Sequence, residues 1–157
     1  MTSYARPPWF RWWLFPATSL VHFADELFAA GGFYTWVARI GGARISMTRF
    51  VSASLLALVS ITIASWAVRK GRYDWLLFTL ATTIFTNALT HAVSSLATHS
   101  YSPGTVSGLI LWLPLGGVIL YHGGAQKRRA VWYFGLFLGT LVNLGVLLLA
   151  MNLGRIP

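Results

Sequence analysis

The chain has 157 residues, of which 56% are hydrophobic, 15% aromatic and only 10% charged, and its mean hydropathy is +0.64. Soluble domains are nearer a quarter charged, so this composition predicts an integral membrane protein. The net charge of +9 does not indicate nucleic-acid binding, because the basic residues cluster between apolar runs and there face lipid head groups. The absence of Cys excludes disulfides, thiolate chemistry and cysteine-based metal sites.

Apolar segments long enough to cross a bilayer predict an all-α polytopic membrane bundle of about five transmembrane helices, forming a single domain over residues 1–157. The predicted spans are about 10–30, 50–68, 75–97, 106–121 and 130–151. In the first span the charge-free stretch from Trp12 to Ala24 is only 13 residues long. This span therefore reaches membrane length only if the polar residues that follow lie inside the bundle.

After the first span, Phe33, Trp36, Val37 and Ile40 recur at helical spacing. This pattern predicts a short amphipathic helix that lies in the membrane interface, over the site described below. Further along, the stretch 75–126 has no Asp, Glu, Lys or Arg and must contain two spans. We expect it to divide at 99–104, where Pro and Gly supply a turn.

The basic residues predict the orientation, because cytoplasmic loops carry an excess of Lys and Arg. With five spans, the side of the N-terminus carries Arg6, Arg11, Arg69, Lys70, Arg72, Lys127, Arg128 and Arg129. The opposite side carries Arg39, Arg44, Arg49 and Arg155. We therefore expect a cytoplasmic N-terminus and an outer C-terminus, in a bacterial plasma membrane.

The chain has three acidic residues, and two of them, Asp25 and Glu26, are adjacent at the end of the first span. An Asp at the centre of a membrane helix costs roughly 2.5–3.5 kcal/mol on the insertion scale, so this pair predicts a functional site. His22 is four residues before Glu26, which places both on one helix face. The alternative is a structural brace that bonds to Arg39 or Asn87.

A depth count brings further polar residues to the same level. At about 1.5 Å per residue, His22 and Glu26 lie roughly 18 and 24 Å beyond Phe10. Asn87 and His91 lie the same distances beyond Trp75, on a span that runs in the same direction. The same count places Asn143 of the last span, and the turn with His99 and Tyr101, in the same outer half of the membrane. We take Asn143 and His99 as residues that surround the site.

The sequences His22-Phe-Ala-Asp25-Glu26, Asn87-Ala-Leu-Thr-His91 and Tyr101-Ser-Pro-Gly104 resemble the HXXEE family of small membrane proteins. That family has a His-x-x-Glu-Glu motif, a second histidine and a Tyr-x-Pro-Gly motif. The resemblance covers about residues 21–104 and implies an integral membrane enzyme without naming a substrate. Asp25 stands where the family has its first glutamate and is one methylene shorter, so Glu26 is the stronger candidate ligand.

The first hypothesis is a divalent metal site, for Zn or Fe, with His22, Glu26 and His91 as ligands. Asp25 and Asn87 would be further ligands or partners of the ligands. Two His and one carboxylate with an open position activate water on zinc or bind non-haem iron. Asp25 would then serve as general base and Tyr101 as acid or orienting donor. This arrangement predicts hydrolysis of a lipid or other hydrophobic small molecule.

Other hypotheses stay open at this point. Adjacent carboxyls in a low dielectric do not both ionise easily, so one could protonate an isoprenoid-like substrate in a metal-free isomerase or cyclase. A small proton-coupled transporter would use the same carboxyls, although the odd number of spans and the lack of an evident repeat disfavour it. A haem between His22 and His91 is a further alternative.

Overall fold

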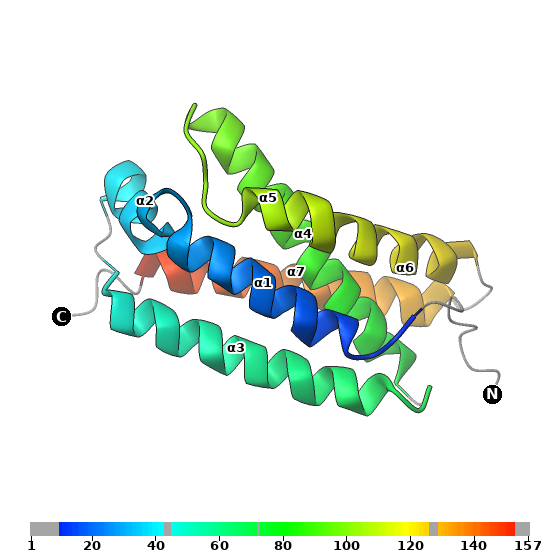
Figure 1. Ribbon diagram of the computed structural model, residues 1–157. Helices are drawn as coiled ribbons and strands as arrows, with labels where there is room; N and C mark the ends of the chain where they lie inside the picture. The colour runs from blue at the N-terminus through cyan, green and yellow to red at the C-terminus, as the bar shows by residue number, and fades with distance from the viewer. Residues whose placement is uncertain (1–9, 43–44, 72, 126–128, 153–157) are drawn as a thin grey trace.

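The computed structural model describes residues 10–42, 45–71, 73–125 and 129–152 (Figure 1), and within them every regular element is helical. The predicted all-α bundle is therefore confirmed. Its helices are α1 (Leu14–Phe28), α2 (Phe33–Gly41), α3 (Met47–Val68), α4 (Asp74–Ala97), α5 (Thr105–Ser107), α6 (Leu113–Ala125) and α7 (Arg129–Asn152).

Four segments of the described chain, rather than five, are long and apolar enough to cross a membrane. They are 47–68, 74–97, 105–125 and 129–150. The prediction that 10–30 forms the first of five spans is corrected, because α1 has only 15 residues. It extends about 22 Å, short of the roughly 30 Å hydrocarbon core.

A sharp change of backbone direction explains why α1 stops where it does. Ala30, Gly31 and Gly32 follow one another with φ of 50°, 83° and 90°. Glycine adopts this left-handed region freely, whereas Ala30 is strained there. The chain therefore leaves the axis of α1 directly after the acidic pair and enters α2. Beyond α2, Gly42 also has a positive φ, and the Ser46 side chain caps α3 by accepting a hydrogen bond from the Arg49 N–H.

Helix α4 lies at the centre of the bundle, where it packs against both α6 and α7, while α1 packs against α3. Gly135 and Gly139, four residues apart in the sequence, lie at the contact between α7 and α4. A Cβ on Gly139 would be 2.5 Å from Thr82 Cβ and 2.6 Å from the Thr79 carbonyl oxygen. The two helix backbones therefore approach more closely than any larger residue would allow.

The segment predicted as the fourth span, 106–121, begins with the short α5, widens into a π-helical turn at Gly108–Trp112 and continues as α6. Pro114 is the second residue of α6, two positions after the end of this turn. A proline lacks the N–H of a regular helix and its ring crowds the carbonyl four residues earlier, so a widened turn relieves the conflict. The widened turn lies on the N-terminal side of Pro114.

The outward faces of α3 and α7 are apolar, as a bilayer requires. Leu56 and Ile63 on α3 are more than 60% exposed, and so is Phe137 on α7. Large exposed apolar surfaces of this kind are unusual on soluble monomers, and they support a membrane location. Of the basic residues used for the orientation, Arg6, Arg44, Arg72, Lys127, Arg128 and Arg155 lie outside the described residues.

Candidate metal centre

Two helices bring together the three side chains at the centre of the site. Helix α1 presents His22 and Glu26 one turn apart, and α4 presents His91; their exposures are 0%, 8% and 4%. Glu26 Oε1 is 3.1 Å from His91 Nε2 and 3.6 Å from His22 Nε2. One nitrogen or oxygen from each residue lies within 4.8 Å of the other two. The depth count therefore placed these three residues correctly.

The spacing of these atoms suits a tetrahedral metal. Two ligands that each lie about 2.0–2.1 Å from zinc at a tetrahedral angle are about 3.3–3.4 Å apart. The two measured distances from Glu26 Oε1, 3.1 and 3.6 Å, bracket this value. Two imidazoles and one carboxylate also form the donor set that binds non-haem iron with open positions.

Asp25 does not belong to this group of three, although it adjoins Glu26 in sequence. Its Oδ1 accepts a hydrogen bond of 3.0 Å from the Tyr101 hydroxyl. Its Oδ2 accepts hydrogen bonds from Ser107, at 3.0 Å from the backbone N–H and 2.6 Å from the hydroxyl. The shorter acid of the motif therefore holds the chain that enters α5, and Glu26 alone faces both histidines.

The segment 101–107 covers the three-residue group and contacts each of its histidines through a serine. Ser107 Oγ is 3.0 Å from His22 Nδ1, and Ser102 Oγ is 3.0 Å from His91 Nδ1. The sequence reasoning missed both serines. Ser102 occupies the variable position of the Tyr-x-Pro-Gly motif, and Ser107 lies one helical turn beyond that motif. Their closeness to the motif in the sequence was the one signal that could have pointed to these two serines.

Gly104 lies directly against the group. Its φ is +97°, and a Cβ there would be 2.9 Å from His91 Cε1 and 3.0 Å from both Glu26 Cγ and His22 Cε1. Only a residue without a side chain allows the segment to approach this closely. The glycine of the Tyr-x-Pro-Gly motif is thus required by the three residues that it covers.

Hydrogen bonds to α4 hold this segment in place. The Ser102 N–H donates to Ser95 Oγ at 2.9 Å, and the Ser95 and Thr105 hydroxyls are 2.8 Å apart. Thr105 also donates to the Ser102 carbonyl oxygen at 2.6 Å. The segment is therefore anchored to the helix that carries His91, which fixes both serines relative to the histidines.

Aromatic rings form the walls of the site. The Trp112 ring stacks on His22, with centroids 3.6 Å apart and an angle of 27° between the planes. The Phe33 ring, at the start of α2, meets His91 edge to face at 5.4 Å. Trp36 of α2 donates from Nε1 to Ser100 Oγ at 3.0 Å. The predicted short helix is therefore present and lies against the site.

The other predicted residues occupy different positions. Asn143 of α7 donates to Thr90 Oγ1 at 3.3 Å and so links two helices one residue before His91. Asn87 Oδ1 is buried and has no hydrogen-bond partner among the described residues. His99 follows α4 with a φ of 47° and is exposed, so it is not part of the buried group.

Tyr101 lies in the turn between α4 and α5, outside the candidate spans. Its partial burial and its hydrogen bond to Asp25 raise the pKa of the Tyr101 phenol above its ordinary value of 10.0. The phenol is therefore protonated at neutral pH, and it can donate to Asp25 throughout the physiological range.

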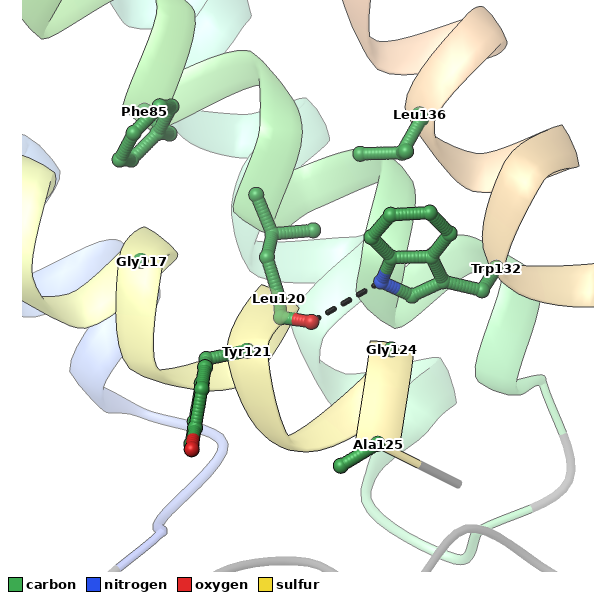
Figure 2. Close-up of a pocket in the computed structure, with 8 residues that line it drawn as sticks. All are labelled: Phe85, Gly117, Leu120, Tyr121, Gly124, Ala125, Trp132 and Leu136. Carbon is green, nitrogen blue, oxygen red and sulfur yellow. Dashed lines mark hydrogen bonds between the residues drawn. The ribbon is translucent and has the colours of Figure 1, made fainter. Parts of the chain in front are cut away.

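A hollow of about 490 Å³ lies away from the three-residue group, between α4, α6 and α7 (Figure 2). It is lined by Phe85, Gly117, Leu120, Tyr121, Gly124, Ala125, Trp132 and Leu136. The Trp132 Nε1 at its wall donates to the Leu120 carbonyl oxygen at 2.9 Å. No His, Asp or Glu is among the described residues that line it, so the hollow has no side chain of the kind gathered in the three-residue group.

Searches of curated proteins and of solved structures gave no match. The sequence model of a family described as "Protein of unknown function with HXXEE motif" matches residues 13–119. This range includes α1 and α4, which supply the three central side chains, and the segment 101–107, which covers them. The chain therefore belongs to the HXXEE family, as its three motifs had indicated.

Proposed function

We propose that this protein is an integral membrane enzyme that uses a divalent metal, zinc or iron, to hydrolyse a lipid or other hydrophobic small molecule. The observation that carries the proposal is the environment of His22 Nε2. This atom is fully buried, has no hydrogen-bond partner among the described residues and lies 3.6 Å from Glu26 Oε1. An unpaired buried polar atom is costly, and a cation between nitrogen and oxygen would remove that cost.

In this proposal His22, Glu26 and His91 hold the metal, and the segment 101–107 keeps bulk water from most of the site. A bound divalent cation would supply Lewis acidity and would make water a nucleophile at neutral pH. Glu26 also neutralises part of the cation's charge inside the bundle, where an isolated ion would be expensive. Asp25 supports this arrangement through Ser107 and Tyr101 rather than as the general base expected from the sequence.

An apolar cleft supports a hydrophobic substrate. It lies between α1 and α3, has a volume of about 190 Å³ and is lined by Leu20, Phe23, Ala24, Leu27, Phe28, Phe50, Val51, Ser54, Leu55 and Leu58. The Phe50 ring at one end is 6.0 Å from Phe33, and Phe33 contacts His91. Its lining is almost entirely apolar, so we expect a hydrocarbon part of the substrate to lie there.

The metal-free alternative also has a specific observation in its favour. His91 Nε2 and Glu26 Oε1 are 3.1 Å apart, which is a normal hydrogen-bond distance. A His–carboxyl pair of this kind can transfer a proton to and from an isoprenoid-like substrate without any metal. It would leave His22 Nε2 unpaired, so we rank this alternative second.

Metal analysis of the purified protein tests the proposal. We expect one zinc or iron per wild-type chain, and we expect His22→Ala, His91→Ala and Glu26→Gln each to abolish stoichiometric metal. His99→Ala is the matched control, because His99 is exposed and outside the group. A wild-type protein without stoichiometric metal, or equal metal content in all variants, would overturn the metal site.

Turnover separates the two chemistries. We expect hydrolysis of a long-chain aryl ester in detergent to stop after treatment with a chelator and to return with zinc or iron. Ester turnover that persists in chelated protein and depends on Glu26 would refute the metal requirement. Isomerisation or cyclisation of a polyprenyl probe by chelated protein would favour the metal-free alternative instead.

Because α1 does not span, the predicted cytoplasmic N-terminus no longer follows from the span count. The orientation that we propose is that of the loops, with the loop between α3 and α4 cytoplasmic and the turn between α4 and α5 outside. Because the chain has no Cys, single cysteines can be introduced and labelled from either side of sealed vesicles. Ser100→Cys, between α4 and α5, should react only from outside, and a cysteine at Lys70, between α3 and α4, only from the cytoplasmic side. The reverse pattern would invert the orientation.

A further inference from the structure

The hydrogen bonds of the segment 101–107 determine which nitrogen of each site histidine carries the proton. We propose that Ser107 and Asp25 keep the proton of His22 on Nδ1 whether or not a cation is bound. His91, by contrast, carries its proton on Nε2 without a cation and on Nδ1 with one. Ser107, Asp25 and Ser102 are thus positioning residues that act through the histidine rings.

The Ser107 hydroxyl donates its hydrogen to Asp25. A serine has one hydroxyl hydrogen to donate. Ser107 Oγ is 2.6 Å from Asp25 Oδ2 and 3.3 Å from the Gly104 carbonyl oxygen. Asp25 also accepts from the Ser107 N–H and from Tyr101, so both of its oxygens already act as acceptors. The Ser107 hydrogen therefore goes to Asp25, with the length of a charge-assisted bond.

The His22 proton follows from this direction. His22 Nδ1 is 3.0 Å from an oxygen whose hydrogen is already committed to Asp25. The ring nitrogen must therefore be the donor, and neutral imidazole carries only one N–H. Nε2 is left with a bare lone pair that faces Glu26 Oε1. Metal-binding histidines are oriented in this way, with the remote N–H donated to a fixed acceptor.

The proton of His91 can occupy either ring nitrogen, because the Ser102 hydroxyl has no second acceptor among the described residues and can either donate to His91 Nδ1 or accept from it. Among the described residues the Ser102 hydroxyl has His91 Nδ1 as its partner. Without a cation Ser102 donates to Nδ1, and the Nε2–H donates to Glu26 at 3.1 Å. When a cation binds Nε2, that proton leaves to solvent, another is taken up at Nδ1, and the Ser102 hydroxyl rotates to accept it. The ring is neutral in both states.

The prediction for His22 holds without the proposed function, whereas the prediction for His91 rests on it. Both are measurable on the full-length chain with ¹⁵N-labelled histidine in detergent micelles. Two-bond ¹H–¹⁵N spectra identify the protonated nitrogen of each ring. The spectra are recorded at about pH 9. His99→Gln and His122→Gln remove the signals of the two exposed histidines.

We expect His22 to show Nδ1–H with and without Zn²⁺, and His91 to change from Nε2–H to Nδ1–H when Zn²⁺ is added. Ser107→Ala should move the His22 proton toward Nε2 and weaken zinc binding about 10- to 100-fold. Ser107→Thr keeps the hydroxyl and should restore both. Ser60→Ala is the matched control, because that hydroxyl bonds only to its own helix on the exposed face of α3.

Asp25→Ala distinguishes positioning from direct ligation. It should move the His22 proton in metal-free protein, although Asp25 reaches His22 only through Ser107; a carboxylate that acts solely as a ligand would leave that proton unmoved. An Nε2–H on wild-type His22, or a Ser107→Ala spectrum identical to that of Ser60→Ala, would overturn the His22 assignment. If zinc does not bind at all, the proposed function and the His91 assignment fail, and the His22 assignment is still decided by the metal-free spectra.

Discussion

Gly104→Ala is the most direct perturbation of the site, because it adds one methyl group at the point where the covering segment meets the cluster. The new Cβ would lie 2.9–3.0 Å from carbons of His22, Glu26 and His91. The glycine also has a φ of +97°, which an alanine rarely adopts. The variant must therefore either strain the backbone and compress these three side chains or move the segment away from them.

The loss of stability in Gly104→Ala has two sources, the left-handed backbone and the added methyl group. A residue with a Cβ in a left-handed conformation costs about 1–2 kcal/mol, and overpacking by one methyl group costs about 1–3 kcal/mol. Together they amount to about 2–5 kcal/mol. If only about 1.4 kcal/mol of this falls on the proposed metal-bound arrangement, we expect the zinc dissociation constant to rise tenfold. Displacement of the segment would also weaken the contacts of Ser102 and Ser107 with the histidines.

The assay is zinc titration of the detergent-purified chain, together with its thermal unfolding midpoint. Gly145→Ala is the matched control, because it lies in α7 and a Cβ there has no neighbour within 4 Å. We expect Gly145→Ala to bind zinc normally and to be as stable as the wild type or slightly more stable. If Gly104→Ala matched Gly145→Ala in both measurements, the close approach of the segment to the cluster would be refuted.

Three further variants test separate parts of the structure. Tyr101→Phe removes the donor to Asp25 and should lower the free energy of unfolding by about 0.5–1 kcal/mol at neutral pH. Because the pKa of Tyr101 is raised in the folded state, this contribution is present below about pH 10 and is lost as the pH rises further, so wild type and variant should converge there; a constant difference would contradict it. Gly139→Ala should destabilise the α4–α7 contact by about 1–3 kcal/mol relative to Gly145→Ala, measured by unfolding in detergent. Asn143→Ala should cost about 0.6 kcal/mol and leave zinc affinity unchanged, and a large loss of affinity would place Asn143 in the site.

The predicted features that the structure confirms are those with a local physical cause. Charge-free runs of membrane length mark the helices because the bilayer excludes unpaired charge. The spacing of four residues puts His22 and Glu26 on one face of a helix, and a constant rise per residue puts His91 at their depth. The first span was overextended because hydropathy does not register the positive φ values at Ala30, Gly31 and Gly32.

The sequence by itself therefore determined the membrane class, the helical bundle, the family and the three residues of the cluster. Only the tertiary structure decided that Asp25 faces away from that cluster, toward Tyr101 and Ser107. Adjacent residues on a helix point about 100° apart, so two neighbouring acids meet different partners, and those partners are set by where the segment 101–107 crosses α1. Serines carry little signal in a sequence, and their role here comes from long-range contacts that no local pattern encodes.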